Sequence, residues 1–501
     1  MTTVKIDTQV LFELSPHLFM QFAEPLGTSD TSIDAAWDFF QKRWQPKALE
    51  MIKKLSPPMI RWGGCFSSYH HWKDAIGPYS QRKPMHNFCW DGIYLNEVGT
   101  AEIAELARTV NAEMLFCVNF ESDGRKHWAY PRPGMDLCGT ADEAAEWVRY
   151  CNDPDDRLRK SHGFVNPFNV RYWQIGNETS YDERGFSSRE NAVKAKYFAE
   201  KMRKSDPGIK LILWGDGPNE EWYTRYHEGK TSYWAEEVCN EAGEYGDYIA
   251  FHNHWSPPDI HGLEYRKNPD RTWERLLEGT GTFEERIIYM RNSVERFHKK
   301  LAITEAHMYV GGRHRGDVLS SWGAGLAYAR CANILQRHGD VVVIATLADF
   351  FGNRWQNNAI MLPTPMWQNN SPYFLPVGTV MALFSSHSGN TAVRATAPDG
   401  VDIAASRNGS RCFIHAVNLH HNQAHTLTFD IDGVTKTPDA IYEISADIMD
   451  EVNDMNPDIF APKKVVPSAD GKYILPASGV AVLEFQLENN PPKSIKKENK
   501  K

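Results

Sequence analysis

The chain has 501 residues, of which 42% are hydrophobic and 24% are charged, which is typical of a globular protein with one large and one smaller domain. Its net charge of −9 disfavours nucleic acid as a partner, because a phosphate-binding surface needs a basic excess. No segment reaches the ~18 apolar residues of a membrane span, and the N-terminus shows no basic segment followed by an apolar one. We therefore expect a cytoplasmic protein with no membrane partner.

The cysteines and histidines give no strong metal signal. The eight cysteines are scattered without C-x-x-C pairing, and several fall in apolar segments, so we expect reduced core thiols. His252 and His254 form an H-x-H pair, which in another barrel could be part of a zinc site, although such enzymes carry the pair on the first strand and need further ligands. We interpret the pair as polar pocket lining and predict no metal and no cofactor.

The first three quarters of the chain alternate between strand-like and helix-like segments. Strands are expected at 17–24, 58–62, 113–119, 169–176, 209–215, 247–252, 301–305 and 341–349. Helices are expected at 46–54, 98–110, 141–150, 188–205, 231–240, 283–300 and 320–337. Parallel strands need helical crossovers and eight of them close, so the pattern predicts a (β/α)8 TIM barrel over 15–375. An open doubly wound sheet is the alternative, but no Gly-rich phosphate loop follows the first strand.

After about Tyr373 the pattern changes to short alternating strands with no long helix between them. Such strands are expected at 401–405, 411–418, 423–431, 440–445 and 479–486. They predict a C-terminal antiparallel β-sandwich domain. The strand-like segment 4–14 has no place in the barrel order, so we predict that the sandwich domain comprises 1–14 plus 376–490. Residues 491–501 are expected to be a disordered basic tail.

Two acidic residues end strand-like runs in the predicted barrel. The run RYWQIGNE ends on Asn177 and Glu178, and the run LAITE ends on Glu305. Barrel enzymes keep their catalytic groups at the carboxyl ends of the strands, and glycoside hydrolysis uses two carboxyl groups. The spacing leaves room for about three βα units, the distance from strand 4 to strand 7. Taken singly, however, an acid after a strand is more often a helix cap or a solvated loop residue.

Other polar and aromatic residues near strand ends are weaker candidates for the site. Trp255 and Trp355 follow strands 6 and 8 and could stack on a sugar ring, although most tryptophans of such a chain belong to the core. Candidates for hydrogen bonding in the loop after strand 8 are Asn353, Gln356 and Asn357. Arg61 is expected to support Glu24 or Glu305 electrostatically.

Several motifs, in order along nearly the whole chain, resemble glycoside hydrolase family 51, the α-L-arabinofuranosidases. They are RWGGCFSSYHHWKDAIGP from Arg61, NEVGTAEI from Asn96, CVN from Cys117, GTADEAAEWVRYCN from Gly139, WQIGNE from Trp173, ATLADFF from Ala345 and IHAVN from Ile414. The resemblance implies that Glu178 is the general acid/base and Glu305 the nucleophile of a retaining double displacement. It also implies that Asn177 holds the sugar 2-OH, that Glu24 binds sugar hydroxyls, and that the protein is a homo-oligomer, often a hexamer in this family.

The sugar-reading residues depart from the family pattern. Cys65 stands where the family usually has an Asn, and a thiol is a poor hydrogen-bond partner. The segment FHNHW stands where a His is usually followed closely by a Tyr, and Ala306 and His307 replace a Trp. An oligosaccharide substrate is expected, with arabinofuranose, galactofuranose, xylose or glucose as the glycone. A catalytically silent sugar-binding paralogue and a metal-dependent barrel hydrolase are the other classes considered.

Overall fold

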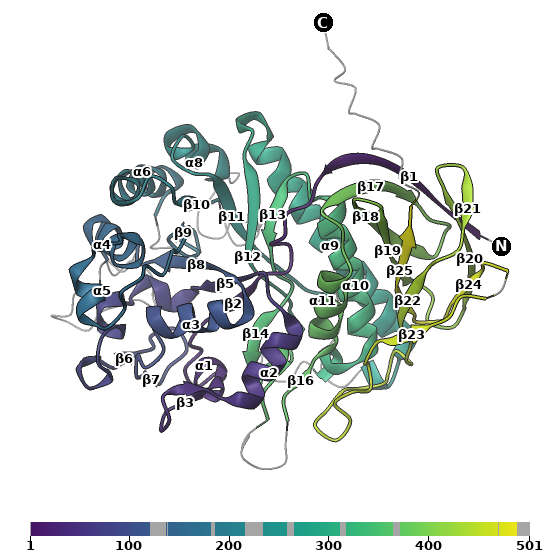
Figure 1. Ribbon diagram of the computed structural model, residues 1–501, viewed down its shortest axis with the longest axis horizontal. Coiled ribbons are helices and arrows are strands. Elements are labelled where there is room, and N and C mark those ends of the chain that lie inside the picture. Colours follow the sequence, from purple (N-terminus) through teal and green to yellow (C-terminus); the bar gives the residue numbers. More distant parts are fainter. Residues whose placement is uncertain are drawn as a thin grey trace, which may run out of the picture.

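The computed structural model describes residues 2–120, 137, 139–181, 186–215, 234–257, 265–310, 317–363, 371–468 and 470–487. Figure 1 shows two parts, a barrel of strands ringed by helices and a β-rich part, which the end of the chain and its first strand build together. The predicted disordered tail 491–501 and Cys138 lie outside the described residues. Among the described residues, no helix combines the length and the apolar character needed to cross a membrane.

The barrel sheet runs in the order β13-β12-β11-β10-β9-β8-β5-β2-β14, and neighbouring strands in this order are parallel. The strands are β2 (Gln21–Ala23), β5 (Met59–Trp62), β8 (Glu113–Val118), β9 (Tyr172–Ile175), β10 (Lys210–Trp214), β11 (Tyr248–Trp255), β12 (Lys300–Met308), β13 (Val342–Ala345) and β14 (Asp349–Gly352). The backbone closes the ring, because Met20 N donates to Ala345 O at 2.8 Å and Ala345 N donates to His17 O at 3.0 Å. The predicted (β/α)8 barrel is therefore confirmed. Its eighth strand is split into β13 and β14.

Helices surround this ring. They are α1 (Ser32–Ala36), α2 (Pro46–Leu55), α3 (Thr100–Val110), α4 (Ala141–Asn152), α5 (Arg157–Ser161), α6 (Ser188–Ser205), α8 (Trp234–Ala242), α9 (Pro269–Val294), α10 (Trp322–Arg337) and α11 (Pro376–Ser386). Helix α6 begins where the sequence predicts, because Ser187 and Glu190 form a capping box. Helix α9 begins well before the expected residue 283, because the glycines at 279 and 281 interrupt its apolar pattern and conceal its first turns.

Helix α11 falls within the residues 376–490 predicted for the second domain, but it packs against α10 and α2 and closes the helical ring. Gly378 allows it to approach the strand that follows β14, since a Cβ at this glycine would lie 2.0 Å from Ala359 O. The segment 63–96 also contains short structure, namely three 3-10 turns and the hairpin β6 (Met85–His86) and β7 (Ile93–Tyr94). Smaller pairings at the edges of the barrel are β3 (Trp37–Asp38) with β4 (Arg43–Trp44), and β15 (Asn358–Met361) with β16 (Tyr373–Phe374).

The second part is one connected ten-stranded sheet in the order β21-β20-β1-β17-β18-β19-β25-β22-β23, with β24 paired to β20. Its strands are β1 (Thr2–Glu13), β17 (Thr391–Thr396), β18 (Val401–Asn408), β19 (Arg411–Asn418), β20 (His425–Ile431), β21 (Val434–Lys436), β22 (Ala440–Ile444), β23 (Lys463–Val465), β24 (Tyr473–Leu475) and β25 (Val480–Gln486). The sheet curls over a core of its own, because Phe429 on β20 contacts Phe485 on β25 with ring centroids 5.2 Å apart. A C-terminal β-rich domain is thus confirmed, although β1 pairs parallel with β20 where only antiparallel pairs were expected.

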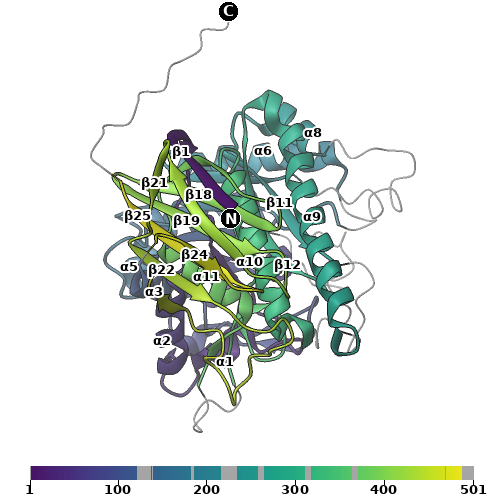
Figure 2. The ribbon, with the colours of Figure 1, turned by 90° about the vertical axis from the view of Figure 1, so that its right-hand side faces the viewer.

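Helix α10 lies between the barrel and the second sheet (Figure 2). Its side chains are buried nearly all round, which explains why it is apolar on more than one face. Polar residues bridge the two parts: Asn333 Nδ2 donates to Asp402 Oδ1 at 2.8 Å, and Gln336 Nε2 lies 2.8 Å from His415 Nδ1. The second sheet is therefore attached to the side of the barrel through α10.

Candidate active site

The first acidic residue stands on a sharp turn after β9. Gly176 has a φ of 79°, and Glu178 has a φ of 53°, the left-handed conformation that side chains other than glycine rarely adopt. Such a conformation costs about 1–2 kcal/mol for an ordinary residue and is found at functional sites held by their surroundings. Here Tyr181 N donates to the Glu178 carbonyl at 3.0 Å, which fixes the turn.

The second acidic residue is aimed by a β-bulge. Phe251 of β11 pairs with Ile303 of β12, but the next residue, His252, pairs with Glu305, so Thr304 is the extra residue. The bulge brings both Thr304 and Glu305 to the same imidazole: Thr304 Oγ1 lies 3.1 Å from His252 Nε2, and Glu305 Oε2 lies 3.5 Å from His252 Nδ1. A regular strand would turn one of these two residues away.

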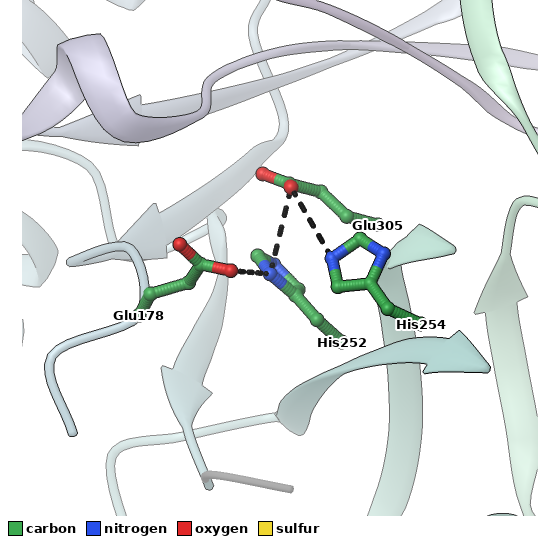
Figure 3. A group of neighbouring side chains, drawn as sticks. All are labelled: Glu178, His252, His254 and Glu305. Atoms are coloured by element: carbon green, nitrogen blue, oxygen red, sulfur yellow. Dashed lines mark hydrogen bonds and ion pairs between the residues drawn. The ribbon is translucent and has the colours of Figure 1, made fainter. Parts of the chain in front are cut away.

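Both glutamates meet at His252 (Figure 3). Glu178 Oε1 lies 2.8 Å from His252 Nδ1, and the second oxygen of Glu178 accepts a hydrogen bond from the Cys65 thiol at 3.5 Å. One ligand-type atom from each of Glu178, His252, His254 and Glu305 lies within 4.8 Å of the others. The structure thus brings together the two acids that the sequence analysis paired, across strands four and seven of the barrel.

Arg61 on β5 connects the ends of three strands from beneath the two acids. Its guanidinium is fully buried, and Nη1 donates to Glu305 Oε1 at 2.8 Å. Nη2 donates to Asn177 Oδ1 at 2.6 Å, and Nε donates to Gln174 Oε1 at 3.0 Å. The arginine therefore supplies the buried countercharge of Glu305, as the sequence predicts. It also orients the Asn177 amide, which the sequence does not predict.

Glu24 forms one wall of the same pocket. Its Oε1 accepts hydrogen bonds from Trp90 Nε1 at 2.8 Å and from Phe66 N at 3.4 Å. Gly64, at φ 141°, lets the backbone pass over it, since a Cβ there would lie 2.2 Å from Glu24 Oε2. Burial raises the pKa of the Glu24 carboxyl well above its usual value, and the charges of Glu305 and Glu178 raise this pKa further against the opposing Trp90 bond.

This raised pKa predicts a pH-dependent stability difference for Glu24→Gln. The folded protein prefers protonated Glu24, so this contribution to stability is complete below the unfolded-state pKa of about 4.5 and is lost as pH rises toward the higher folded-state pKa. We expect the melting temperature of the variant, relative to the wild type, to increase from about pH 5 to about pH 8. Glu50→Gln, at an exposed helical position, is the control. A pH-independent difference for Glu24→Gln would contradict the prediction.

The pocket has a volume of about 260 Å³ and lies at the carboxyl ends of the strands. It is lined by Phe22, Glu24, Leu26, Cys65, Cys89, Trp90, Glu178, Tyr181, His254, Glu305, His307, Asp349 and Trp355. The rings of Trp90 and Trp355 meet edge to face at 5.5 Å and form an aromatic side. The segment 63–96 thus contributes Trp90 and Cys89 to the pocket.

His307 and Asp349 are pocket residues that sequence reasoning did not identify as a pair. His307 Nδ1 lies 3.0 Å from Asp349 Oδ1, and within the described parts of the chain His307 Nε2 has no hydrogen-bond partner. The alternation of a strand could have indicated His307. Strand β12 continues to Met308, so the side chain of His307 lies on the same side of the strand as that of Glu305. A carboxylate that holds Nδ1 leaves Nε2 for a ligand hydroxyl.

Five predicted binding residues are not among those that line the pocket: Asn177 and His252, which contact Arg61 and Glu178, and Trp255, Asn353 and Gln356. Trp255 is buried outside the barrel against Phe283 of α9, with ring centroids 4.7 Å apart. Strand β11 runs to residue 255 and not to 252, so its alternation turns His252 and His254 inward and Trp255 outward. Asn353 and Gln356 lie in the turn after β14, where Asn353 N donates to Asp30 Oδ1 at 2.8 Å. This turn brings Trp355, and not the two amides, to the pocket.

A closed (β/α)8 barrel with two carboxyl groups facing each other at the ends of strands four and seven is the arrangement of a barrel-type glycoside hydrolase. Family models agree with it. The model "Alpha-L-arabinofuranosidase 1 domain" matches residues 51–254, and the model "Alpha-L-arabinofuranosidase C-terminal domain" matches residues 309–489. The chain belongs to the α-L-arabinofuranosidase-like proteins of glycoside hydrolase family 51.

Curated relatives match over part of their length. Probable alpha-L-arabinofuranosidase C of Aspergillus fumigatus is 34% identical over 181 residues, which are 35% of this chain and 33% of that protein. An intracellular exo-alpha-(1->5)-L-arabinofuranosidase of Halalkalibacterium halodurans is 29% identical over 226 residues, 44% of this chain and 41% of that protein. The chain thus matches about a third to two fifths of the length of these relatives.

Solved structures match over nearly the whole chain and show the fold. The arabinose complex of α-L-arabinofuranosidase from Thermotoga maritima has a TM-score of 0.76 at 24% identity, covering 97% of this chain and 100% of that one. The family 44 endoglucanase Cel44A from Clostridium thermocellum has a TM-score of 0.60 at 14% identity, covering 96% and 99%. Because proteins named for different substrates share it, the fold by itself does not set the glycone.

Proposed function

We propose that this protein is a retaining, exo-acting α-L-arabinofuranosidase that releases terminal arabinofuranosyl groups from oligosaccharides. The observation that carries the proposal is the meeting of Glu178 and Glu305 at His252 Nδ1, at 2.8 and 3.5 Å. The facing oxygens of the two acids lie within 4.8 Å of each other. Retaining glycosidases hold their carboxyl groups ~5–5.5 Å apart, whereas inverting enzymes separate them by ~6.5–9.5 Å to admit a water.

In the proposed reaction Glu305 attacks the anomeric carbon while Glu178 protonates the departing glycosidic oxygen. The covalent ester forms as the C–O bond to the leaving group breaks. Glu178, now a carboxylate, then removes a proton from water, which attacks the same carbon and releases the sugar and Glu305. One carboxyl group serves both steps, because esterification of Glu305 removes the charge that opposes ionisation of Glu178.

The surrounding residues support these roles. Arg61 fixes Glu305 Oε1 at 2.8 Å, which leaves Oε2 facing the pocket for attack. Asn177 presents its Oδ1 to Arg61, so its amide nitrogen is the atom that can bind the sugar 2-OH. Glu24, hydrogen-bonded by Trp90 at 2.8 Å, is placed to bind further hydroxyls. His252 Nδ1 contacts both acids, so it can hydrogen-bond to whichever of the two carboxyl groups is ionised at each step.

The proposal also specifies the sugar that is released and the cellular location of the enzyme. The two arabinofuranosidase models favour arabinofuranose, and the intracellular relative from Halalkalibacterium halodurans agrees with a cytoplasmic enzyme acting on imported oligosaccharides. The segment FHNHW and the residues Ala306 and His307, which depart from the family pattern, favour a second candidate with another pentose or hexose as the glycone. A panel of aryl α-L-arabinofuranoside, β-galactofuranoside, β-xyloside and β-glucoside substrates separates these. Activity on none of them would support a silent sugar-binding protein instead.

Replacing the acid/base distinguishes its role from a structural one. For Glu178→Ala we expect kcat/KM to fall by roughly 10²–10⁴-fold on natural glycosides, because a positioned acid contributes about that much. Substrates with a good leaving group, such as 2,4-dinitrophenyl glycosides, need little protonation and should lose far less in the first step. Steady-state kinetics on both substrate types is the measurement.

The matched control is Cys65→Ala, which removes a hydrogen bond to Glu178 and leaves the carboxyl in place. Its loss on natural glycosides should be much smaller than that of Glu178→Ala, because the acid is still present. If Glu178→Ala slowed both types by the same factor, Glu178 would not be the acid.

A further inference from the structure

Four side chains of the pocket turn one nitrogen or oxygen atom each toward a common point (Figure 3). Glu178 Oε1 and Glu305 Oε2 lie 2.8 and 3.5 Å from His252 Nδ1. Glu305 Oε2 lies 3.9 Å from His254 Nε2. The two imidazoles come from the inward side of β11, and the carboxyl groups come from the ends of β9 and β12, so the donors approach from three strands.

Glu178 Oε1 and His252 Nδ1 are at hydrogen-bond distance, but the two separations that involve Glu305 Oε2 are closer to those of metal ligands. Nitrogen-to-oxygen hydrogen bonds are ~2.9 Å long, and the separations of 3.5 and 3.9 Å exceed this distance. Zinc bonds to histidine and carboxylate are ~2.0–2.2 Å long, so two ligands of a tetrahedral ion lie roughly 3.3–3.5 Å apart.

We propose that Glu178, His252, His254 and Glu305 form a binding site for a divalent transition-metal ion of the zinc type, and that the bound ion blocks hydrolysis. The donor set of two imidazoles and two carboxylates suits zinc, which accepts nitrogen and oxygen ligands in a tetrahedron. The inhibitory part rests on the proposed function, because the ion would occupy both the nucleophile and the acid/base. The ion is thus an inhibitor of this site and not its cofactor.

The charge around the site favours a cation. Glu24, Glu178 and Glu305 all line the one pocket, and Arg61 pairs with the Glu305 oxygen that faces away from the histidines. The raised pKa of Glu24 has the charges of the other two carboxylates among its causes, which shows that their negative field reaches across the pocket. A divalent ion between Glu178 and Glu305 would reduce this field.

The histidines are held and reachable as ligands should be. His252 Nε2 contacts Thr304 Oγ1 at 3.1 Å, and such an outer partner fixes the ring so that Nδ1 faces the ion. The His254 side chain is 23% exposed, so an ion can enter from the pocket mouth. His254 belongs to the segment FHNHW, which departs from the pattern of the resembling family.

Cobalt is the probe that tests the site directly. CoCl2 added to the EDTA-treated and dialysed full-length protein should give the visible absorption of four-coordinate Co²⁺, because cobalt adopts the zinc geometry. ZnCl2 should displace it. L-arabinose, which would occupy the same pocket, should also displace it. In His254→Tyr, cobalt affinity should fall by about tenfold or more, because even the loss of a residue that only supports a ligand typically costs 10–100-fold.

A matched control removes a histidine pair that is remote from the pocket. His420 Nδ1 lies 3.1 Å from His425 Nε2 in the second sheet, a place where cobalt could bind adventitiously. His420→Ala should leave the cobalt spectrum and affinity unchanged. Loss of binding in His420→Ala, or unchanged binding in a folded His254→Tyr, would overturn the proposal, as would a six-coordinate spectrum in the wild type. If His254→Tyr does not fold, displacement of cobalt from the wild type by L-arabinose decides.

Measurements of hydrolysis with and without zinc test the metal site and the proposed function separately. Zinc should inhibit hydrolysis of an aryl arabinofuranoside competitively, and EDTA should restore the rate and not reduce it. An active enzyme that zinc does not inhibit would refute the metal site alone. Cobalt binding by a protein that hydrolyses no glycoside on the panel would refute the proposed hydrolase and leave the metal site standing. Activity that EDTA abolishes would refute the inhibitory role.

Discussion

Glu305→Ala is expected to lower kcat by about 10⁴-fold or more, as the loss of a covalent nucleophile does. The physical reason is that, among the described residues that line the pocket, the other carboxyl groups are engaged: Glu178 must carry the proton, Glu24 is hydrogen-bonded by Trp90 Nε1, and Asp349 is paired with His307. Turnover of an aryl glycoside, measured with enzyme purified from a host lacking such glycosidases, is the readout. Near-normal turnover would exclude Glu305 as the nucleophile.

Glu305→Gln is the matched control, because it keeps an oxygen for Arg61 Nη1 and removes only the charge and nucleophilicity. It should be as inactive as Glu305→Ala while folding more stably. Azide can then replace the missing nucleophile in Glu305→Ala, since the cavity left by the side chain admits a small anion. Attack by azide from the face of Glu305 would give a glycosyl azide of inverted configuration. A product of retained configuration would contradict the assignment.

Arg61→Met is expected to destabilise the protein by about 3–5 kcal/mol, because it leaves a buried carboxylate without its countercharge. It also leaves the oxygens of Asn177 and Gln174 without the donors that they have now, at 2.6 and 3.0 Å. The activity should fall together with the stability, since Glu305 and Asn177 lose the group that orients both. Chemical denaturation and steady-state kinetics on the same preparations measure the two effects.

Arg159→Met is the control for burying a methionine in place of an arginine. Arg159 is also fully buried but donates to backbone carbonyls, among them Tyr150 O at 2.9 Å. It should lose stability without a specific loss of kcat in the folded enzyme. The double variant Arg61→Met/Glu305→Gln should be less destabilised than the sum of its single variants, because neither buried charge remains. Additive losses would mean that the pair does not interact energetically.

Local pattern was enough to predict much of the barrel. Helix α6 occupies the predicted residues 188–205 because its capping box marks its start, and most strands lie within a few residues of their predicted places. The acids were found for a related reason. Carboxyl ends of parallel strands share one mouth, so residues that end two such runs must come near each other whatever the loops do. The pairing of Glu178 with Glu305 needed no knowledge of long-range contacts.

Trp255 was predicted to bind substrate because the predicted strand ended at residue 252, three residues too early. The apolar run of β11 fades at 252, but hydrogen bonds to β12 extend it to 255 and turn Trp255 outward. The same extension of β12 brings His307 inward, where it meets Asp349 from β14. Neighbouring strands decide such extensions, and a side-chain pattern read along one strand does not contain them.

The barrel, the β-rich domain that follows it and the two acids can be predicted from the amino-acid sequence, because the hydrophobic period and the residues at strand ends are local properties. The assembly of the site follows from long-range contacts: the bulge at Thr304, the three hydrogen bonds of Arg61, the placement of α11 and the convergence of four possible ligand atoms. These depend on register between strands far apart in the chain. Register is set by the packing of the whole barrel, so it cannot be predicted from the sequence of one segment.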